Sequence, residues 1–375
     1  MRVIVVGAGA AGMVAALRLS EKGCHVILIE QGEIPHSRAA SFDQHRIIRH
    51  MYPGQDGYAR LVDHALAAWE RLWVTLGRSH LAETGVLAIS TEPGDWTDRG
   101  REGLERLGTP FRQMDAPALR QWLPQFQFAD RAVGIFTERG GALFPDRIAT
   151  DLAEALRQSG VTLVPREKVA SIDPSAGRVV TEGGAVFLAD RVLYSGGAWA
   201  PALFPDLAQT LALYRQAILY LKAPEKWTGA WAETPVIVDL GGETGCYVLP
   251  PVAGSDMKVC APDHRRRGDP DRDAALDENE DADIRAYFRY ALPDLADYQT
   301  LYMKTCFYTV TPDDRFLLQR RERLVLFSGC SGHGYKFAAL NGEKLAQVVL
   351  GEADFETTAR LLGGQEVQQA RVTAK

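Results

Sequence analysis

The chain has 375 residues, 46% of them hydrophobic and 24% charged, and a formal net charge of −6. This composition is ordinary for a globular protein, and the length allows a large core and two intertwined domains. The negative charge argues against nucleic-acid binding, and no apolar run reaches the roughly 18 residues of a membrane-spanning helix, so neither partner is expected.

Apolar periodicity predicts the elements of the first half of the chain. In order they are a strand at 2–6, a helix at 10–22, a strand at 25–30, a polar loop at 31–45, a helix at 56–76, a strand at 85–90 and a helix at 145–159. The first three of these elements form a βαβ pattern.

Strand patterns return in the second half of the chain. Those between 161 and 196 are typical of a crossover to the first sheet with a small β excursion, and alternation at 213–258 indicates a mixed or antiparallel sheet. A strand at 325–328 precedes a glycine-rich turn and a closing helix at about 336–350. The predicted fold class is α/β (α+β), with a discontinuous Rossmann-like domain and a second domain built on a mixed or antiparallel sheet. The expected boundaries are 1–85, 145–210 and 310–375 for the first domain, and 86–144 and 211–309 for the second.

Charge runs and cysteines add two expectations. The basic cluster at 265–267 lies beside the acidic stretch 269–283, and we interpret both as a solvated surface excursion rather than a binding patch. The five cysteines lack the paired spacing of a metal site, so no metal is predicted. An odd number of cysteines in a chain that begins directly with a strand pattern predicts reduced thiols and a cytoplasmic location.

A glycine motif follows the first predicted strand and opens the first helix. Gly7, Gly9 and Gly12 form GxGxxG, in which the first glycine allows a tight turn, the second leaves room for a pyrophosphate and the third lets the helix pack closely. The backbone N–H groups at the helix start, around Ala10 and Ala11, are expected to face the phosphates.

An acidic residue completes this unit. Glu30 ends the second strand, where a carboxylate accepts hydrogen bonds from the ribose hydroxyls of the adenosine. The motif alone is weak, but strand, turn, helix, second strand and terminal acid all occur in register, which favours dinucleotide binding over a chance glycine-rich turn. An acid at this place fits FAD or NAD and disfavours NADP.

Three further segments decide between the two cofactors. They are "HRIIRHMYPGQDGYARLVDHALAAWERL" at 45–72, "YRQ" at 214–216 with "MKV" at 257–259, and "KTCFYTVTPDDRFLL…LVLFSGCSGHGYKFAALNGEKLAQ" at 304–347. In order and spacing they resemble the monomeric sarcosine oxidase and N-methyltryptophan oxidase group of the D-amino-acid-oxidase-like flavoproteins. The resemblance implies a monomeric FAD-dependent amine oxidase. Such an enzyme takes a hydride from the carbon beside a secondary amine, leaves an imine, and reduces O₂ to H₂O₂.

The resemblance also assigns residues to the flavin. Cys306 matches the cysteine that carries FAD through a thioether, although a lone cysteine is more often a buried structural residue, and Cys330 is a weaker rival. Arg46 matches a position near the flavin ring, and the helix start at Gly332–Lys336 would stabilise charge on the ring. The remaining positions expected to contact FAD are Ser41, Val169, Gly197, Trp199, Gly332, Gly334, Tyr335 and Lys336.

Other positions match the reacting part of the family's site. Lys258 matches a lysine that promotes electron transfer to O₂, because a fixed cation stabilises the negative charge that develops there; the alternative is an exposed lysine on an edge strand. Arg49 and Lys336 match the pair that binds the substrate carboxylate. Tyr308 and Tyr247 are expected to cover the substrate, or else to belong to the core.

The sequence departs from the family's pattern near the substrate. Pro262 stands where the family often carries a histidine, with His264 two positions further on, and His45 replaces a small hydroxyl residue. His45 is a candidate polar contact to a new substituent, or else a surface or supporting histidine. These changes put sarcosine itself in doubt and leave the flavin chemistry standing.

Three functional classes remain open on the sequence. The first is an oxidase of N-methyl or cyclic amino acids, and the second is a flavin dehydrogenase of the same fold with another electron acceptor. Lys258 favours the oxidase, since a dehydrogenase needs no O₂-activating cation. The third class, an NAD-dependent enzyme or dinucleotide sensor, is disfavoured by the segment "SGHGYK".

Overall fold

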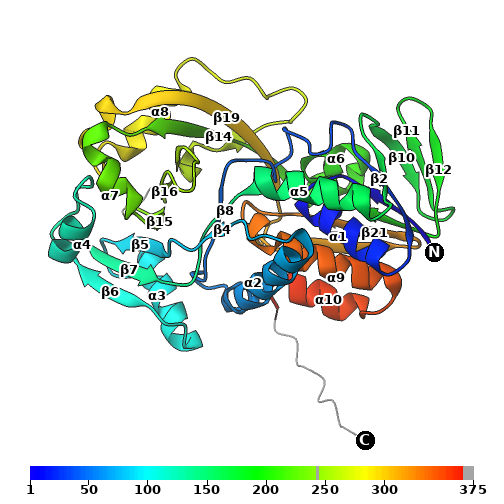
Figure 1. Ribbon diagram of the computed structural model, residues 1–375, viewed down its shortest axis with the longest axis horizontal. Helices are drawn as coiled ribbons and strands as arrows, with labels where there is room; N and C mark the ends of the chain where they lie inside the picture. Colours follow the sequence, from blue (N-terminus) through cyan, green and yellow to red (C-terminus); the bar gives the residue numbers. More distant parts are fainter. Residues whose placement is uncertain (242–244, 366–375) are drawn as a thin grey trace, which may run out of the picture.

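The structure is a computed structural model that describes residues 1–241 and 245–365. One of its two large sheets lies on the right in Figure 1. Its strand order is β20 (Leu317–Arg321), β21 (Leu324–Ser328), β13 (Arg191–Tyr194), β1 (Arg2–Val6), β2 (His25–Ile29) and β9 (Thr162–Val164). Neighbouring strands from β21 to β9 are parallel, whereas β20 is antiparallel to β21. The predicted βαβ unit and the return crossover are both confirmed.

Helices cover this parallel sheet because it must be buried on both sides. Three of them, α1 (Ala10–Glu21), α5 (Pro145–Gln158) and α9 (Ala338–Leu350), lie side by side on one face, and α2 (Asp56–Leu76) and α10 (Phe355–Leu362) pack beyond them (Figure 1). The small sheet of β10 (Val169–Asp173), β11 (Arg178–Thr181) and β12 (Val186–Leu188) is the predicted β excursion. The closing helix begins at Ala338, after a 3₁₀ turn at Tyr335–Phe337 that the sequence did not predict.

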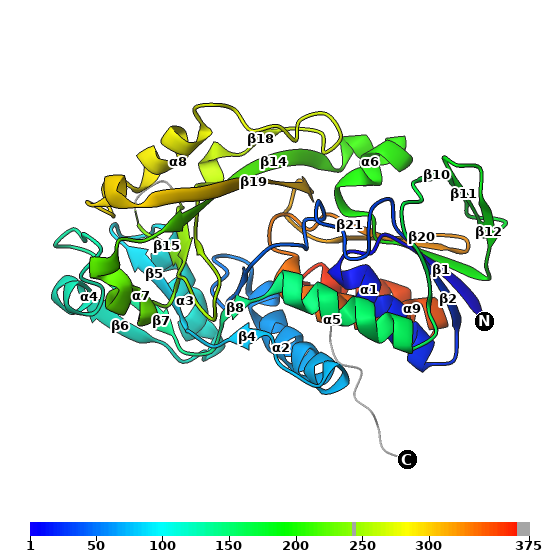
Figure 2. The ribbon, with the colours of Figure 1, turned by 45° about the horizontal axis from the view of Figure 1, so that its top comes forward.

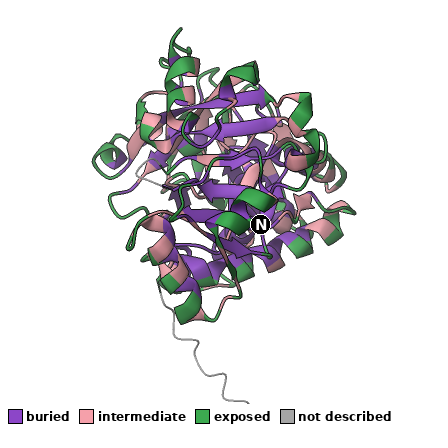
Figure 3. Cartoon of the chain, turned by 90° about the vertical axis from the view of Figure 1, so that its left-hand side faces the viewer, coloured by how far each residue is buried: buried purple, intermediate pink, exposed green. Residues whose placement is uncertain are grey.

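The second large sheet is mixed and mostly antiparallel, as predicted. Its strands are β18 (Arg266–Arg267), β14 (Ala212–Lys222), β17 (Met257–Cys260), β16 (Tyr247–Leu249), β15 (Val236–Asp239), β5 (Val86–Ser90), β7 (Val133–Thr137), β6 (Arg112–Asp115) and β19 (Gln299–Val310), which pairs with β14. The long β14–β19 ladder runs from this sheet toward the parallel one (Figure 2). The strands are largely buried, and exposure gathers on outer helices and loops (Figure 3). The predicted domain boundaries follow the two sheets and stay a prediction.

Several other elements were not predicted. The helices α3 (Trp96–Leu107), α4 (Ala116–Trp122), α7 (Thr228–Ala232) and α8 (Glu280–Phe288) cover the second sheet. A third small sheet, formed by β3 (Arg46–Ile48), β8 (Gly141–Leu143) and β4 (Leu81–Ala82), also lies outside the predicted elements. No helix among the described residues has the length and apolar character needed to cross a membrane.

The two faces of β14 differ, and this difference positions the site. Alternate residues of a strand point to opposite sides. Ala217 and Leu219 point into the core of the second sheet, whereas Gln216 and Ile218 line a cavity on the other side. On β19, Cys306 and Tyr308 pair with the cavity-facing positions of β14 and line the same cavity.

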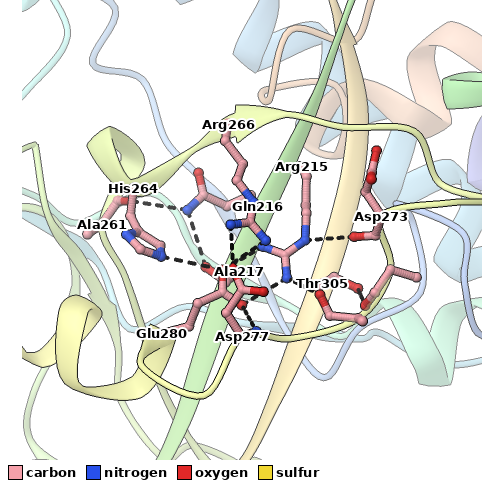
Figure 4. Close-up of polar contacts among 12 residues, drawn as sticks. Arg215, Gln216, Ala217, Ala261, His264, Arg266, Asp273, Asp277, Glu280 and Thr305 are labelled. Carbon is pink, nitrogen blue, oxygen red and sulfur yellow. Dashed lines mark hydrogen bonds and ion pairs between the residues drawn. The ribbon is translucent and has the colours of Figure 1, made fainter.

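The interpretation of 265–283 as a solvated excursion is wrong for its buried part. Glu280, which begins α8, is only 2% exposed and forms a bidentate ion pair with the equally buried Arg215 of β14 (Figure 4). Arg215 also donates to the backbone carbonyls of Asp273 and Ala275. A buried guanidinium requires such partners, so Glu280 supplies the counter-charge for Arg215. The residues at 265–267 and 271–279 are exposed, as predicted.

Candidate active site

A cavity of about 660 Å³ extends from the first turn of the parallel sheet to the inner face of β14 and β19. Its size is within the usual range for a ligand pocket. Nearly all predicted cofactor positions line it: Gly7, Gly9, Ala10, Ala11, Gly12, Glu30, Ser41, Arg46, Val169, Gly197, Trp199, Cys306, Gly332, Gly334 and Tyr335. Residues from the beginning, middle and end of the chain therefore meet at one surface.

The glycine turn at one end of the cavity cannot hold larger residues. Gly7 has φ +101°, and a Cβ there would lie 2.8 Å from the carbonyl oxygen of Ser195. A Cβ on Gly12 would lie 2.1 Å from the carbonyl oxygen of Gly7, so the close packing of α1 on β1 requires glycine. The Ala10 N–H donates to the Ser41 hydroxyl at 3.0 Å. The cradle has the shape that a pyrophosphate needs.

Glu30 lies beside this turn and is 6% exposed. Its carboxylate accepts from the Ala8 N–H at 2.7 Å and lies 3.0 Å from His36 Nδ1. These contacts fix an acceptor at the end of β2, where the ribose of a dinucleotide binds. Val169 and Trp199 line the cavity beyond it, in the positions expected for the adenosine end.

At the other end of the cavity, Cys306 is half-buried and lies near Arg46, whose Nη2 is 3.6 Å from the Cys306 Sγ. Cys330, the predicted rival, lines the same cavity, but burial raises its pKa to about 11. Burial therefore disfavours the thiolate, the reactive form of cysteine, at Cys330.

A buried carboxylate, which the sequence did not single out, lies next to this cysteine. Asp43 is 3% exposed and forms ion pairs with Lys258, at 2.7 Å, and with Arg46. The Tyr220 hydroxyl donates to its other oxygen. Two cations and a phenol thus share one carboxylate, and the partners come from β14, β17 and β3.

Lys258 is 1% exposed on an interior strand, so it is not an exposed lysine on an edge strand. Its ammonium also donates to the backbone carbonyl of His45 at 2.9 Å. Burial and the charge of Arg46 lower the pKa of this ammonium, and the pair with Asp43 favours its charged form. Lys258 is not among the residues that line the cavity, since its head group is turned to Asp43.

Arg49 and Lys336 both lie near a different partner, the ring of Tyr52. The Arg49 guanidinium is 4.5 Å and the Lys336 ammonium 5.4 Å from the ring centroid. Among residues 1–241 and 245–365, neither cation forms an ion pair, and Arg49 Nη1 is buried without a hydrogen-bond partner. Burial lowers the pKa of both groups. The Lys336 ammonium donates to the backbone carbonyl of His333 at 3.2 Å. A buried cation without a counter-charge is costly, so this place favours an anion.

The remaining predicted residues fall into two groups. Tyr247, Tyr308 and Pro262 line the cavity. His45 does not line it and is fully buried, and burial together with the Lys258 charge lowers its pKa to about 3. The neutral imidazole packs outside the cavity lining, and the backbone carbonyl of His45 accepts a hydrogen bond from Lys258. Contact of the ring with substrate stays a prediction. His264 lies 3.5 Å from Glu280, away from the lining residues.

The fold and the cavity define a class: an oxidoreductase that binds a dinucleotide at a βαβ turn and has Cys306 and Arg49 among the residues that line the same cavity. Comparison with known proteins agrees. The family model for FAD-dependent oxidoreductases matches residues 2–348, and the chain belongs to this family. FAD is therefore the dinucleotide that the glycine cradle, the Glu30 acceptor and the cavity fit.

The relatives cover nearly the whole chain. A peroxisomal sarcosine oxidase of Mus musculus is 30% identical over 92% of this chain and 91% of its own length. A monomeric sarcosine oxidase of a Bacillus species is 26% identical, with 92% of both chains covered. Among solved structures, NikD, described as an unusual amino acid oxidase essential for nikkomycin biosynthesis, has a TM-score of 0.82 at 21% identity, covering 98% of both chains. The last likeness shows the fold alone.

Proposed function

We propose that this FAD-dependent oxidoreductase is an amine oxidase acting on the C–N bond of an N-methyl or cyclic amino acid. The observation that carries the proposal is the pair of unpaired buried cations, Arg49 and Lys336, on the ring of Tyr52. An amino-acid carboxylate supplies the missing counter-charge. The named activities of the sequence relatives, sarcosine oxidation and N-methyl-L-tryptophan oxidation, support the same substrate class.

The residues divide the work as follows. When bound, FAD supplies the acceptor for a hydride from the carbon beside the amine and passes the electrons to O₂. Arg49 and Lys336 hold the substrate carboxylate and thereby orient that carbon. Tyr308 and Tyr247 line the cavity and exclude water around the amine. The product imine leaves the site and is hydrolysed by water.

We further propose that Cys306 tethers FAD covalently and that Lys258 promotes the reaction with O₂. The thiol of Cys306 is half-buried, lines the cavity and lies 3.6 Å from a guanidinium nitrogen of Arg46. Lys258 is a buried cation fixed by its ion pair with Asp43. Asp43 also forms an ion pair with Arg46, the neighbour of Cys306, so these two ion pairs link Lys258 to the surroundings of Cys306. Action as a monomer is also proposed, by analogy with the Bacillus relative, and a cytoplasmic location stays a prediction from the sequence.

One preparation tests the flavin proposals. The purified protein is precipitated with acid, and the absorption of the pellet and the supernatant is compared for the wild type and for Cys306→Ala, with Cys330→Ala as a matched control. We expect colour in the pellet except for Cys306→Ala. Colour in the wild-type supernatant contradicts the tether, and colour lost with Cys330→Ala moves it to that residue.

A second assay tests the reaction itself. H₂O₂ formation is measured over a panel of N-methyl and cyclic amino acids, alongside reduction of a dye under nitrogen. We expect peroxide from at least one member of the panel. Dye reduction without peroxide would make the protein a dehydrogenase, and no reaction with any member would refute the substrate class.

A further inference from the structure

A third cation, Arg265, lines the cavity and belongs to the segment 262–280. This segment follows β17, pairs with β14 through β18, and runs over β14 before α8 begins (Figure 2). Pro262 and Arg265 are its cavity-lining residues. The segment is fixed by the buried Arg215–Glu280 pair, so the position of Arg265 is set by the fold rather than by a free loop.

Strand alternation separates the three consecutive arginines. Arg266 lies opposite Arg215 in the β14–β18 ladder and pairs with Asp277, on the side where Glu280 is buried (Figure 4). Arg265 and Arg267 point to the opposite side, where both guanidinium groups lie over the ring of Tyr214, at 4.8 and 4.6 Å from its centroid. Of the two, Arg265 lines the cavity and Arg267 does not.

Burial raises the pKa of the Tyr308 hydroxyl, and the nearby charge of Arg265 lowers it. Tyr308 lines the cavity and stacks on Tyr214, with ring centroids 6.4 Å apart. In the part of the chain that the structure describes, Arg265 forms no ion pair, whereas Arg266 has an acidic partner. Arg265 is exposed to solvent, lies over the ring of Tyr214 and lines the cavity, so its charge is available to a ligand bound there.

We propose that Arg265 binds a second acidic group of the substrate, so that the enzyme prefers a secondary amino acid that also carries a side-chain carboxylate. This inference rests on the proposed amine oxidation. Arg49 and Lys336 receive the first carboxylate, and Arg265 supplies a cationic partner for the second. A guanidinium fork suits a planar carboxylate, because two parallel N–H donors match its two oxygens.

The test uses an isosteric pair of ligands, N-methylglutamate and N-methylglutamine, which differ in the side-chain charge. Their kcat/KM values, and their dissociation constants by calorimetry on the FAD-loaded protein without O₂, are measured for the wild type, Arg265→Gln and Arg267→Gln. We expect the wild type to prefer N-methylglutamate by about 10- to 100-fold, the usual range for a hydrogen bond to a charged group. Arg265→Gln should reduce the preference to near one, and Arg267→Gln should retain it.

Each other outcome has a definite meaning. An equal preference in the wild type and Arg265→Gln overturns the proposal, as does an equal loss in both variants, which would indicate general surface charge. A lower FAD content in Arg265→Gln than in Arg267→Gln would assign the arginine to the cofactor instead. If neither compound is oxidised but calorimetry shows the expected change in preference, the acid-binding role stands and the proposed reaction is wrong.

Discussion

Asp43 is the one buried carboxylate that we find shared between Lys258 and Arg46 in the described chain, which makes its replacement informative. The side chains of Asp43 and Lys258 are each 1% exposed. Removing one member of a buried ion pair typically costs about 3–5 kcal/mol, because the other charge is left in an apolar environment. We therefore expect Asp43→Asn to lower the free energy of unfolding by about that amount.

A double-mutant cycle separates this pair from general damage to the fold. Asp43→Asn, Lys258→Met and the double variant are unfolded in urea at pH 7 and followed by circular dichroism. Because Lys258→Met removes the charge that Asp43→Asn strands, the double variant should be more stable than the sum of the single losses predicts, by about 2 kcal/mol. If the loss of stability in the double variant equals the sum of the two single losses within about 0.5 kcal/mol, the two residues are not coupled. Asp43 would then not hold Lys258 in place.

Three further changes test the rest of the site. Arg49→Ala should weaken binding of acidic substrates by about 2–5 kcal/mol, since the substrate carboxylate loses its partner, and an unchanged KM would place the carboxylate elsewhere. Lys258→Met should slow flavin reoxidation by O₂ far more than flavin reduction by substrate in stopped-flow traces; equal slowing removes its assigned role. Burial raises the pKa of Asp239 to about 6, so its carboxyl binds a proton more readily in the folded than in the unfolded chain. Its contribution to stability therefore falls by about 3 kcal/mol as pH rises from about 4 to 6, and urea unfolding of Asp239→Asn across that window should lack this fall.

The elements with strong local signals could be predicted from the sequence. The helix predicted at 56–76 has those bounds in the structure, because its apolar stripe is long and regular. The glycine turn and Glu30 were placed correctly, since the motif encodes a local backbone shape. The helices α3 and α4 were missed because they are short and polar on most of their surface.

The candidate site was harder to predict, because its contacts join distant parts of the chain. Lys258 and Asp43 are 215 positions apart, and no local pattern marks Asp43 as the partner of a buried lysine. Placing Cys306, Arg46 and Arg49 at one cavity depended on resemblance to a family, and the structure shows that all three line it. Within the charge run at 265–283 only the burial of Glu280 was missed, because its partner, Arg215, lies on a strand that the sequence marks only as alternating.

The cations at the cavity divide according to whether the protein itself supplies a partner. Asp43 forms ion pairs with both Lys258 and Arg46, so the protein itself holds these two charges in place. Arg49 lies over the rings of Tyr52 and Trp96, and Arg265 lies over the ring of Tyr214. Lys336 lies near the rings of Tyr52 and Phe337 and donates one hydrogen bond to the backbone carbonyl of His333. An aromatic face stabilises a cation without satisfying its hydrogen-bond donors, and so leaves them for a ligand. Asp43 therefore distinguishes the cations that the protein pairs with its own carboxylate, Lys258 and Arg46, from those that it does not. Its loss should disturb the first group and leave the second intact.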